Sequence, residues 1–319
     1  MKPRPTSPAA HRTVLLLTAV CAAALTATAC GGSPGSAPPV PGKSGGAGPD
    51  YLADAPEAAA AAMPDDSTMA KIRKRGYLIV GGSSDAPLLS QKNPTTGKYE
   101  GFDADMGRLL AAYILGEPNV RIVSSATQTR EALLQNHTVD VVFQTYSITP
   151  ERARQVTFVG PYLSSGFQIA TRKGTQGITT LADLNGQTVI AGANTPAIPE
   201  IKKAAPKAKI LTFDTDPACI QALKQGRGKA YVQDNITLAG TVKTSPDLQI
   251  TGEPFNEGNM GIGVPKDQPE MSKFVNTWLT KVIDDGHWSK VWKANFGDTL
   301  GDKTPPVVGS VPDVYSSKD

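Results

Sequence analysis

The pattern of apolar and polar residues divides the chain into an alternating central region and two polar, irregular ends. Short apolar runs predict strands at residues 77–82, 120–123, 139–144, 188–191, 209–213, 230–233 and 262–264. Apolar residues that recur every three or four positions predict helices at 71–75, 104–115, 129–135, 181–184, 197–204, 217–225, 271–285 and 288–296. This alternation predicts an α/β protein with two mostly parallel sheets flanked by helices.

The segments on either side of this region lack the large apolar residues that a core requires. Residues 30–66 are mainly Gly, Pro, Ser and Ala, and such a composition cannot bury enough surface to offset chain entropy. We therefore expect a disordered tether there. Residues 301–319, which contain Pro305 and Pro306, are expected to form a flexible tail.

The N-terminus has the pattern of a secretory signal peptide. Lys2, Arg4 and Arg12 precede the apolar run 14–25, and small residues follow it. The run is shorter than the roughly 20 residues that span a bilayer comfortably. We expect residues 1–29 to be removed on export.

Cys30 follows these small residues and resembles the cysteine of a bacterial lipobox, which becomes the lipidated first residue of the mature protein. The pattern departs from that motif at Ala27, where leucine is usual. The resemblance implies a protein held by its lipid at the extracellular face of the cell membrane. An ordinary signal peptide cleaved nearby is the alternative.

Export changes the charge balance of the chain. Of 32 Lys and Arg residues, three lie in residues 1–29 with no acidic residue, which leaves 29 against 29 Asp and Glu. A neutral mature chain does not favour a nucleic-acid partner. Cys21 lies in the signal and Cys30 at the predicted anchor, so Cys219 has no intrachain disulfide partner and is expected to be buried.

Polar residues follow several predicted strands, where the ligands of α/β proteins bind. Asp85, the segment 145–147 and Asp234 all occupy such positions. In the stretch "TYSITPER", Thr149 is a suitable N-cap and Pro150 suits the first helical position. Helix N–H groups and the forked cation of Arg152 favour a carboxylate ligand. The alternative is a capped surface helix in which Arg152 pairs with a nearby acid.

Six segments in order carry a family resemblance: "VGGSSDAPLL", "GKYEGFDADMGRLLA", "LLQNHTVDVVFQTYSITPERARQVTFVGPYL", "ADLNGQTVIAGANTPA", "LKQGRGKAYVQD" and "WLTKVIDDGHWSKVWKANFG". With these segments the chain resembles the family 3 extracellular solute-binding proteins, which serve ABC importers of polar amino acids. The resemblance covers about residues 69–297. It implies a two-lobed clamp of the type II periplasmic-binding-protein class, with lobe 1 formed by 67–166 and 260–300 and lobe 2 by 167–259.

The resemblance also implies how a free amino acid is held. Arg152 would bind its α-carboxylate, with Thr145 and Ser147 beside it. Thr195 would add donors from the second lobe. Asp85 and Asp234, one from each lobe, would hold the α-ammonium. Because these groups come from both lobes, the ligand would drive closure of the clamp.

Arg130 suggests which amino acid is bound. Its position resembles the arginine that glutamate- and aspartate-binding members place against the side-chain carboxylate, with Thr127 as a helper. This favours L-glutamate, with glutamine or aspartate also possible. A surface pair between Arg130 and Glu131 is the alternative. Ser83 and Ser84 stand where acidic-ligand members often have a second cation, which leaves a neutral polar ligand open.

Other functions remain as alternatives. Some relatives with this fold are amino-acid-pathway dehydratases, but neither mature histidine, His137 or His287, belongs to a nucleophile motif or a metal-spaced cluster. We expect a monomeric binding protein that delivers its ligand to an ABC permease and uses no metal or cofactor. A sensor that docks onto a receptor would have the same sequence features.

Overall fold

The computed structural model describes residues 50–311. The predicted signal peptide, Cys30, the first part of the tether and residues 312–319 lie outside the described residues. Eight strands form one mixed sheet, in the spatial order β5-β1-β6-β11-β7-β10-β8-β9. They are β1 (Leu78–Gly82), β5 (Val120–Ser124), β6 (Val141–Val142), β7 (Thr157–Arg172), β8 (Thr188–Gly192), β9 (Lys209–Phe213), β10 (Ala230–Asp234) and β11 (Leu248–Val264).

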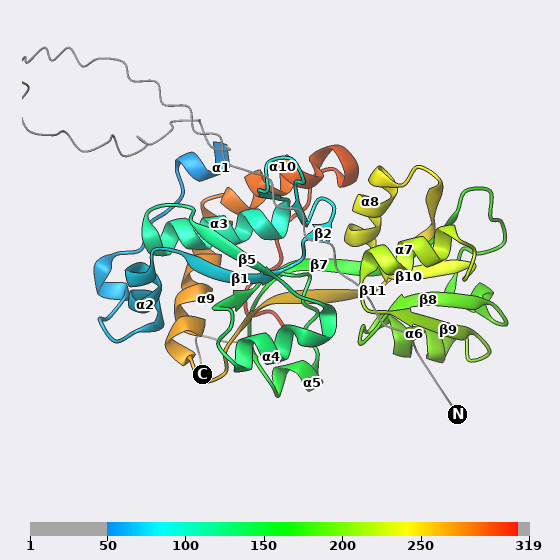
Figure 1. The fold of residues 1–319 in the computed structure, drawn as a ribbon, viewed down its shortest axis with the longest axis horizontal. Helices are drawn as coiled ribbons and strands as arrows, with labels where there is room; N and C mark the ends of the chain where they lie inside the picture. The colour runs from blue at the N-terminus through cyan, green and yellow to red at the C-terminus, as the bar shows by residue number, and fades with distance from the viewer. Residues whose placement is uncertain (1–49, 312–319) are drawn as a thin grey trace, which may run out of the picture. The chain divides into compact units, whose positions relative to one another are not determined.

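The long antiparallel strands β7 and β11 join the two parts of this sheet. Figure 1 shows them running side by side from the part that contains β1 to the part that contains β10. The first part (β5, β1, β6) and the second part (β10, β8, β9) are each internally parallel. The expected α/β class is therefore confirmed, and the two expected sheets are connected through the β7–β11 ribbon. Register shifts in β11 between Thr251 and Ile262 bend this ribbon.

A separate antiparallel sheet lies between β1 and the first long helix along the chain. It consists of β2 (Asp85–Ala86), β3 (Ser90–Lys92) and β4 (Tyr99–Glu100). Gly101, which precedes that helix, has a φ of 121°. A Cβ at Gly101 would lie 2.5 Å from the backbone of Leu89, so this close approach requires glycine.

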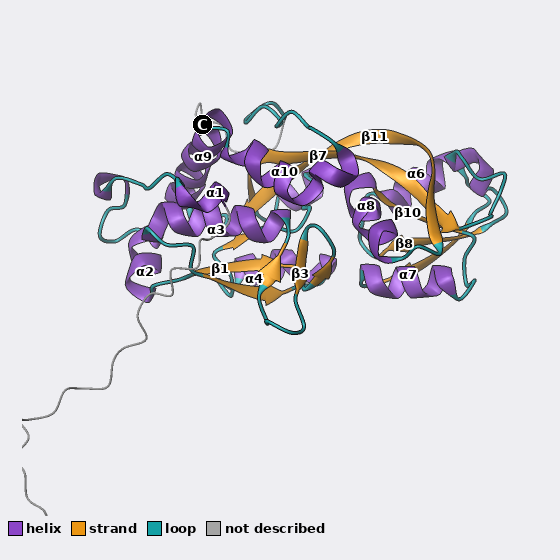
Figure 2. Ribbon diagram, turned by 90° about the horizontal axis from the view of Figure 1, so that it is seen from above, coloured by secondary structure: helices purple, strands orange, loops and turns teal. Residues whose placement is uncertain are grey.

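The helices cover both parts of the sheet, and Figure 2 shows α3 and α10 beside the first part and α7 and α8 beside the second. They are α1 (Asp50–Ala53), α2 (Thr68–Arg75), α3 (Phe102–Leu115), α4 (Arg130–Gln135), α5 (Pro150–Ala153), α6 (Ala197–Ala204), α7 (Asp216–Lys224), α8 (Asn235–Thr244), α9 (Pro269–Asp284) and α10 (His287–Leu300). Short 3-10 helices lie at η1 (Ala60–Ala62), η2 (Thr127–Thr129) and η3 (Leu181–Leu184).

Aromatic side chains dominate the core of the first part. Phe102 contacts Trp288 and Trp292, whose rings stack at 5.5 Å with an interplanar angle of 5°. Trp278 belongs to the same core. Burial of rings of this size supplies much of the apolar area that stabilises a domain.

The second part has a core on each face of its sheet. Val189 and Val232 contribute to one face, and Ile190 and Tyr231 to the other, as the alternation of side chains along a strand requires. Cys219 is buried in the second of these cores, and burial raises the pKa of its thiol to about 12.

The structure differs from the expected tether over residues 50–66. Tyr51 and Met63 are buried in the first core, and the amide of Ala58 donates to the carbonyl of Tyr113 at 2.9 Å. These few apolar side chains and backbone bonds order a segment whose overall composition is that of a linker. The expectation of a disordered tether is therefore wrong for residues 50–66.

The described start of the tail, residues 301–311, also packs against the first part. The indole N–H of Trp292 donates to the carbonyl of Gly301 at 2.8 Å, and Lys303 Nζ donates to the carbonyl of Ser164 at 2.6 Å. The amide of Gly309 donates to the carbonyl of Gly160 at 2.7 Å. Hydrogen bonds to α10 and to β7 thus fix a segment that was expected to be flexible.

Within residues 50–311, the helices are all too short or too polar to cross a bilayer.

Candidate functional site

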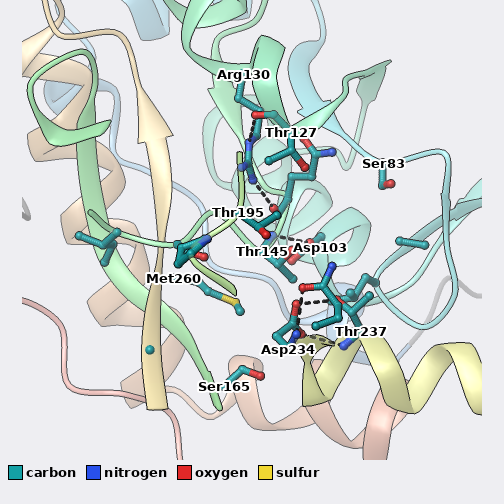
Figure 3. Close-up of a pocket in the computed structure, with 18 of the residues that line it drawn as sticks. Ser83, Asp103, Thr127, Arg130, Thr145, Ser165, Thr195, Asp234, Thr237 and Met260 are labelled. Atoms are coloured by element: carbon teal, nitrogen blue, oxygen red, sulfur yellow. Dashed lines mark hydrogen bonds between the residues drawn. The ribbon is translucent and has the colours of Figure 1, made fainter. Parts of the chain in front are cut away.

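A cavity of about 150 Å³ lies where several strands of the sheet end. Its wall contains most of the site residues that the sequence predicted: Arg130, Thr145, Ser147, Arg152, Thr195 and Asp234. Thr195 and Asp234 follow β8 and β10, whereas the other four follow β5 and β6. The volume is below the range of drug-sized pockets and suits one small metabolite. Figure 3 shows Arg130 and Thr127 at one end of this view and Asp234 and Thr237 towards the other.

Arg152 is held as the capping pattern predicts. The hydroxyl of Thr149 accepts a hydrogen bond from the amide of Arg152 at 3.3 Å, at the N-terminus of α5. The guanidinium is buried, and its Nη1 donates to the carbonyl of Ser147 at 2.8 Å. Its Nη2 donates to the carbonyl of Asn194 at 2.9 Å, which follows β8. Arg152 therefore links the segment after β6 with the segment after β8, one from each part of the sheet.

Arg152 also has an acidic neighbour, which the alternative interpretation of this stretch anticipated. Its Nε lies 3.6 Å from Oε1 of Glu131. The side chain of Arg152 is nevertheless in the cavity wall rather than on an open surface. Burial lowers the pKa of Arg152, and Glu131 partly opposes this effect.

Arg130 is a second buried cation in the wall. Only 3% of the residue is exposed, and it donates from Nε to the carbonyl of Thr127 at 3.1 Å and from Nη1 to the carbonyl of Gln144 at 2.9 Å. The described residues include no ion pair to Arg130 and no hydrogen bond from its Nη2, and Glu131 lies against Arg152 instead. Burial and the nearby charge of Arg152 lower the pKa of Arg130 to about 10.

The ring of Tyr146 lies between these two cations. Arg130 lies 4.1 Å and Arg152 5.2 Å from its centroid. The negative face of an aromatic ring attracts a guanidinium, and the attraction is strongest away from water. Tyr146 therefore helps two like charges to coexist in one small cavity. Tyr146 was not among the predicted site residues, although it lies inside "TYSITPER".

Asp234 supplies the predicted negative charge from the second part of the sheet. It caps α8, accepting from the amide and the hydroxyl of Thr237, both at 2.8 Å. It is buried, and burial raises the pKa of its carboxyl to about 6 despite these two donors. A buried carboxylate with spare lone pairs is suited to accept further N–H donors.

Asp103 is an acid that the sequence analysis did not assign to the site. It lies at the start of α3 and is 2% exposed. It accepts from the hydroxyl of Tyr162 at 2.8 Å and from the amide of Thr145 at 3.2 Å. Thr145 has a φ of 40°, in the left-handed region, so the carboxylate holds a strained backbone against the cavity. Burial raises the pKa of Asp103 to about 7.

Asp216 is a second acid in the wall that was missed. It begins α7, directly after β9. Because ligands bind beyond the carboxyl ends of strands, its position was a signal that the sequence contained.

Asp85 was predicted as a site residue, but the structure does not place it in the cavity wall. Its carboxylate is exposed on β2 and accepts from the hydroxyl of Ser83 at 2.8 Å. Ser83 itself lines the cavity, so Asp85 lies close to its rim.

The two histidines of the described region lie away from the cavity wall. His137 contacts Asp267 at 3.1 Å in an exposed position, and His287 lies 3.0 Å from the carbonyl of Asp54. Residues 50–311 also contain no group of three or more His, Cys, Asp or Glu side chains that could hold a metal ion.

Fold and cavity together define the class of protein. A sheet in two parts joined by an antiparallel ribbon, with a small polar cavity lined from both parts, is the architecture of a type II periplasmic binding protein. Buried cations and acids in one such cavity are suited to a small molecule with both carboxylate and ammonium groups.

Comparison with known proteins gives the family. Residues 78–298 match the model of the bacterial extracellular solute-binding proteins, family 3, and the chain belongs to that family. It is 33% identical over 228 residues to the ABC transporter glutamine-binding protein GlnH of Bacillus subtilis, covering 71% of this chain and 83% of that protein. It is 30% identical over 246 residues to the glutamate-binding protein GluB of Corynebacterium efficiens, covering 73% and 83% of the two chains.

Solved structures agree with this assignment. The solute receptor for L-cysteine of Neisseria gonorrhoeae superposes with a TM-score of 0.69 at 28% identity, covering 74% of this chain and 96% of that one. The ancestral amino acid-binding protein AncCDT-1, described as a precursor of cyclohexadienyl dehydratase, superposes with a TM-score of 0.66 at 31% identity, covering 72% and 100%. The expected family and fold are thereby confirmed.

Proposed function

We propose that this protein captures one free polar L-amino acid outside the cell membrane and delivers it to an ABC permease. The observation that carries the proposal is the pair of buried arginines and the buried Asp234 around one cavity of metabolite size. The relatives named for glutamine and glutamate support it. Two lobes, 67–166 with 260–300 and 167–259, would close on the ligand, with the β7–β11 ribbon as the hinge.

In the proposed arrangement, the cations and acids bind opposite ends of the ligand. Arg152 binds the α-carboxylate, assisted by donors from Thr145, Ser147 and Thr195. Asp234 accepts from the α-ammonium. Asp85 is the proposed acid from the first lobe, and it would have to turn inward from its exposed position to reach the ligand. Each contact is a charge-assisted hydrogen bond, which is stronger than a hydrogen bond between two neutral groups.

Arg130 then faces the ligand side chain. Its Nη2 has no acceptor among the described residues, so an oxygen on the ligand would complete its hydrogen bonds. L-Glutamate, which the sequence favours, and L-glutamine both carry an oxygen at the end of a side chain of this length. L-Aspartate carries the same group on a shorter side chain.

The position in the cell follows from the N-terminus. We propose that Cys30 is lipidated and that residues 31–49 separate the binding domain from the membrane surface. A lipid anchor at Cys30 would keep the protein close to its permease. A single clamp binds one ligand, so we expect a monomer.

Calorimetry of residues 31–319 with the 20 amino acids tests the proposal. We expect one or two polar amino acids to bind with a 1:1 stoichiometry. Arg130→Ala should weaken the binding of ligands with an oxygen-bearing side chain by roughly 10- to 100-fold, because each of these ligands loses a hydrogen bond to a charged group. Absence of binding to every amino acid would contradict the proposal.

An enzymatic role is the second candidate, supported by the superposition with the precursor of a dehydratase. Incubation with radioactive ligand and recovery of the unchanged ligand would argue against it. A sensor role would be favoured if the gene lay beside a receptor kinase and without a permease.

A further inference from the structure

Asp216 is the acid in the cavity wall to which the proposed arrangement gives no role. Asp234 receives the α-ammonium, and Asp103 holds the backbone of Thr145. Asp216 lies at the first position of α7 and contributes a third carboxylate to the same small cavity.

The surroundings of Asp216 fix its side chain and leave one oxygen available. Oδ1 accepts from the hydroxyl of Tyr231 and from the side-chain amide of Gln233, the latter at 2.8 Å. The described residues provide no donor to Oδ2. The side-chain oxygen of Gln233 in turn accepts from the amide of Asp234 at 2.9 Å, so the two acids are held in one network.

The charges in the wall do not favour another anion. The wall contains two arginines, Arg130 and Arg152, and three acids, Asp103, Asp216 and Asp234. A zwitterion without side-chain charge leaves this balance unchanged. A ligand with a second carboxylate adds a negative charge to a small buried cavity, where an unbalanced charge is costly.

We infer that Asp216 is a specificity-determining residue that selects a side-chain carboxamide, so that the preferred ligand is L-glutamine rather than L-glutamate. This inference rests on the proposed function. A carboxamide has an oxygen that accepts from Arg130 and an NH₂ group that donates to Oδ2 of Asp216. A carboxylate has acceptors only, and its second oxygen would face the oxygen of Asp216.

The electrostatics of the second lobe agree with this assignment. Burial raises the pKa of Asp216, and the neighbouring charge of Asp85 adds to the effect, while Arg130 opposes it. The charge of Asp216 in turn contributes to the raised pKa of Asp234. An N–H donor from the ligand would stabilise the ionised form of Asp216, whereas a further anion would destabilise it.

Three ligands test the inference on the unmodified protein by calorimetry: L-glutamine, L-glutamate and L-glutamate γ-methyl ester. The ester is neutral and keeps the carbonyl acceptor, but it has no N–H donor. We expect glutamine to bind roughly 10- to 100-fold more tightly than either of the others. Equal or tighter binding of glutamate or of the ester would overturn the inference and leave the proposed function intact. A protein that bound no amino acid would contradict the proposed function, and the inference with it.

A matched pair of variants tests whether Asp216 causes the preference for glutamine over glutamate. Asp216→Asn replaces an acceptor by a group that also donates, so the ratio of glutamine to glutamate affinity should fall by about tenfold or more. Asp214→Asn removes the same charge from an exposed residue outside the cavity wall and should leave the ratio unchanged. An unchanged ratio in folded Asp216→Asn, checked by thermal unfolding, would overturn the inference. If that variant does not fold, the ester comparison decides.

Discussion

Tyr146 explains how the cavity holds two guanidinium groups without an ion pair to each. Its ring contacts both cations, and backbone carbonyls accept two hydrogen bonds from each guanidinium. Neutral acceptors lower the cost of burying a cation without cancelling its charge. Each arginine therefore keeps its charge available to a ligand.

At the scale of single residues, Arg152→Ala should weaken the binding of every amino acid ligand by at least about 100-fold, since it leaves the ligand's α-carboxylate buried without its cationic partner. Arg152→Lys keeps the charge but loses the fork that reaches both Ser147 and Asn194, so we expect it to recover only part of the affinity. Calorimetry measures both. An Arg152→Ala protein with unchanged affinity would show that this residue does not bind the α-carboxylate.

Asp103 gives a prediction for the pH dependence of stability. Its folded pKa of about 7 lies above the unfolded value of 3.8, so the folded state binds more protons between these values. The free energy of unfolding should therefore contain a contribution from Asp103 that is fully present below about pH 4 and lost as the pH rises through 7.

Asp103→Asn removes this contribution. From pH 4.5 to 7.5, the free energy of unfolding should fall less steeply in the variant than in the unmodified protein. The two slopes should differ by up to roughly 1 kcal/mol per pH unit. Urea unfolding at several pH values measures the two slopes. Identical slopes would show that the carboxyl of Asp103 titrates normally.

Among the elements, α8 lies close to the segment that follows β2. A Cβ at Gly240 would collide with the carbonyl oxygen of Pro87, which follows β2. Glycine is otherwise unfavourable in a helix by roughly 1 kcal/mol relative to alanine. Its presence in α8 is explained by this contact.

Gly240→Ala should therefore weaken ligand binding by roughly tenfold, because the collision separates α8 from the segment after β2. Thermal unfolding should show that the variant remains folded. Gly297→Ala in α10 is the control, since a Cβ there would meet only the flexible side chain of Lys293. Equal affinities of the two variants would show that the contact between α8 and Pro87 does not affect ligand binding.

The sequence predicted most central elements within two residues but missed others for identifiable reasons. Helix 197–204 and strand 209–213 have the expected bounds. The strand expected at 139–144 is limited to Val141–Val142. Strand β7 escaped notice because Gly160, Pro161 and two serines interrupt its apolar pattern. Helix α8 contains three Thr residues and one Gly, which are weak helix formers, and it depends on its cap and its packing.

Site residues were predictable from the sequence where they belong to a local motif. Arg152 and its cap were evident in eight residues of sequence. Asp103 lies inside an expected helix, where nothing local distinguishes it from a surface acid, and only the fold brings it to Thr145. The exposed orientation of Asp85 depends on the small β2–β3–β4 sheet, which has too few residues to show a pattern.

For the whole molecule, Cys30→Ser should release the protein into the medium, because a single lipid is the proposed anchor. Cys219→Ser is the control, since that buried thiol lies in a core of the second part of the sheet and should not affect attachment. Immunoblots of cell and medium fractions measure the distribution. Retention of Cys30→Ser on the cells would contradict the lipid anchor.

The stacked indoles of the first core determine what optical methods can detect. All three tryptophans of the chain, Trp278, Trp288 and Trp292, lie in that core, and none lines the cavity. Their emission should therefore report the melting of the first part of the molecule and change little when ligand binds. A fluorophore attached to the second part, for example at the exposed position of Asp214, would be needed to follow the proposed closure in real time.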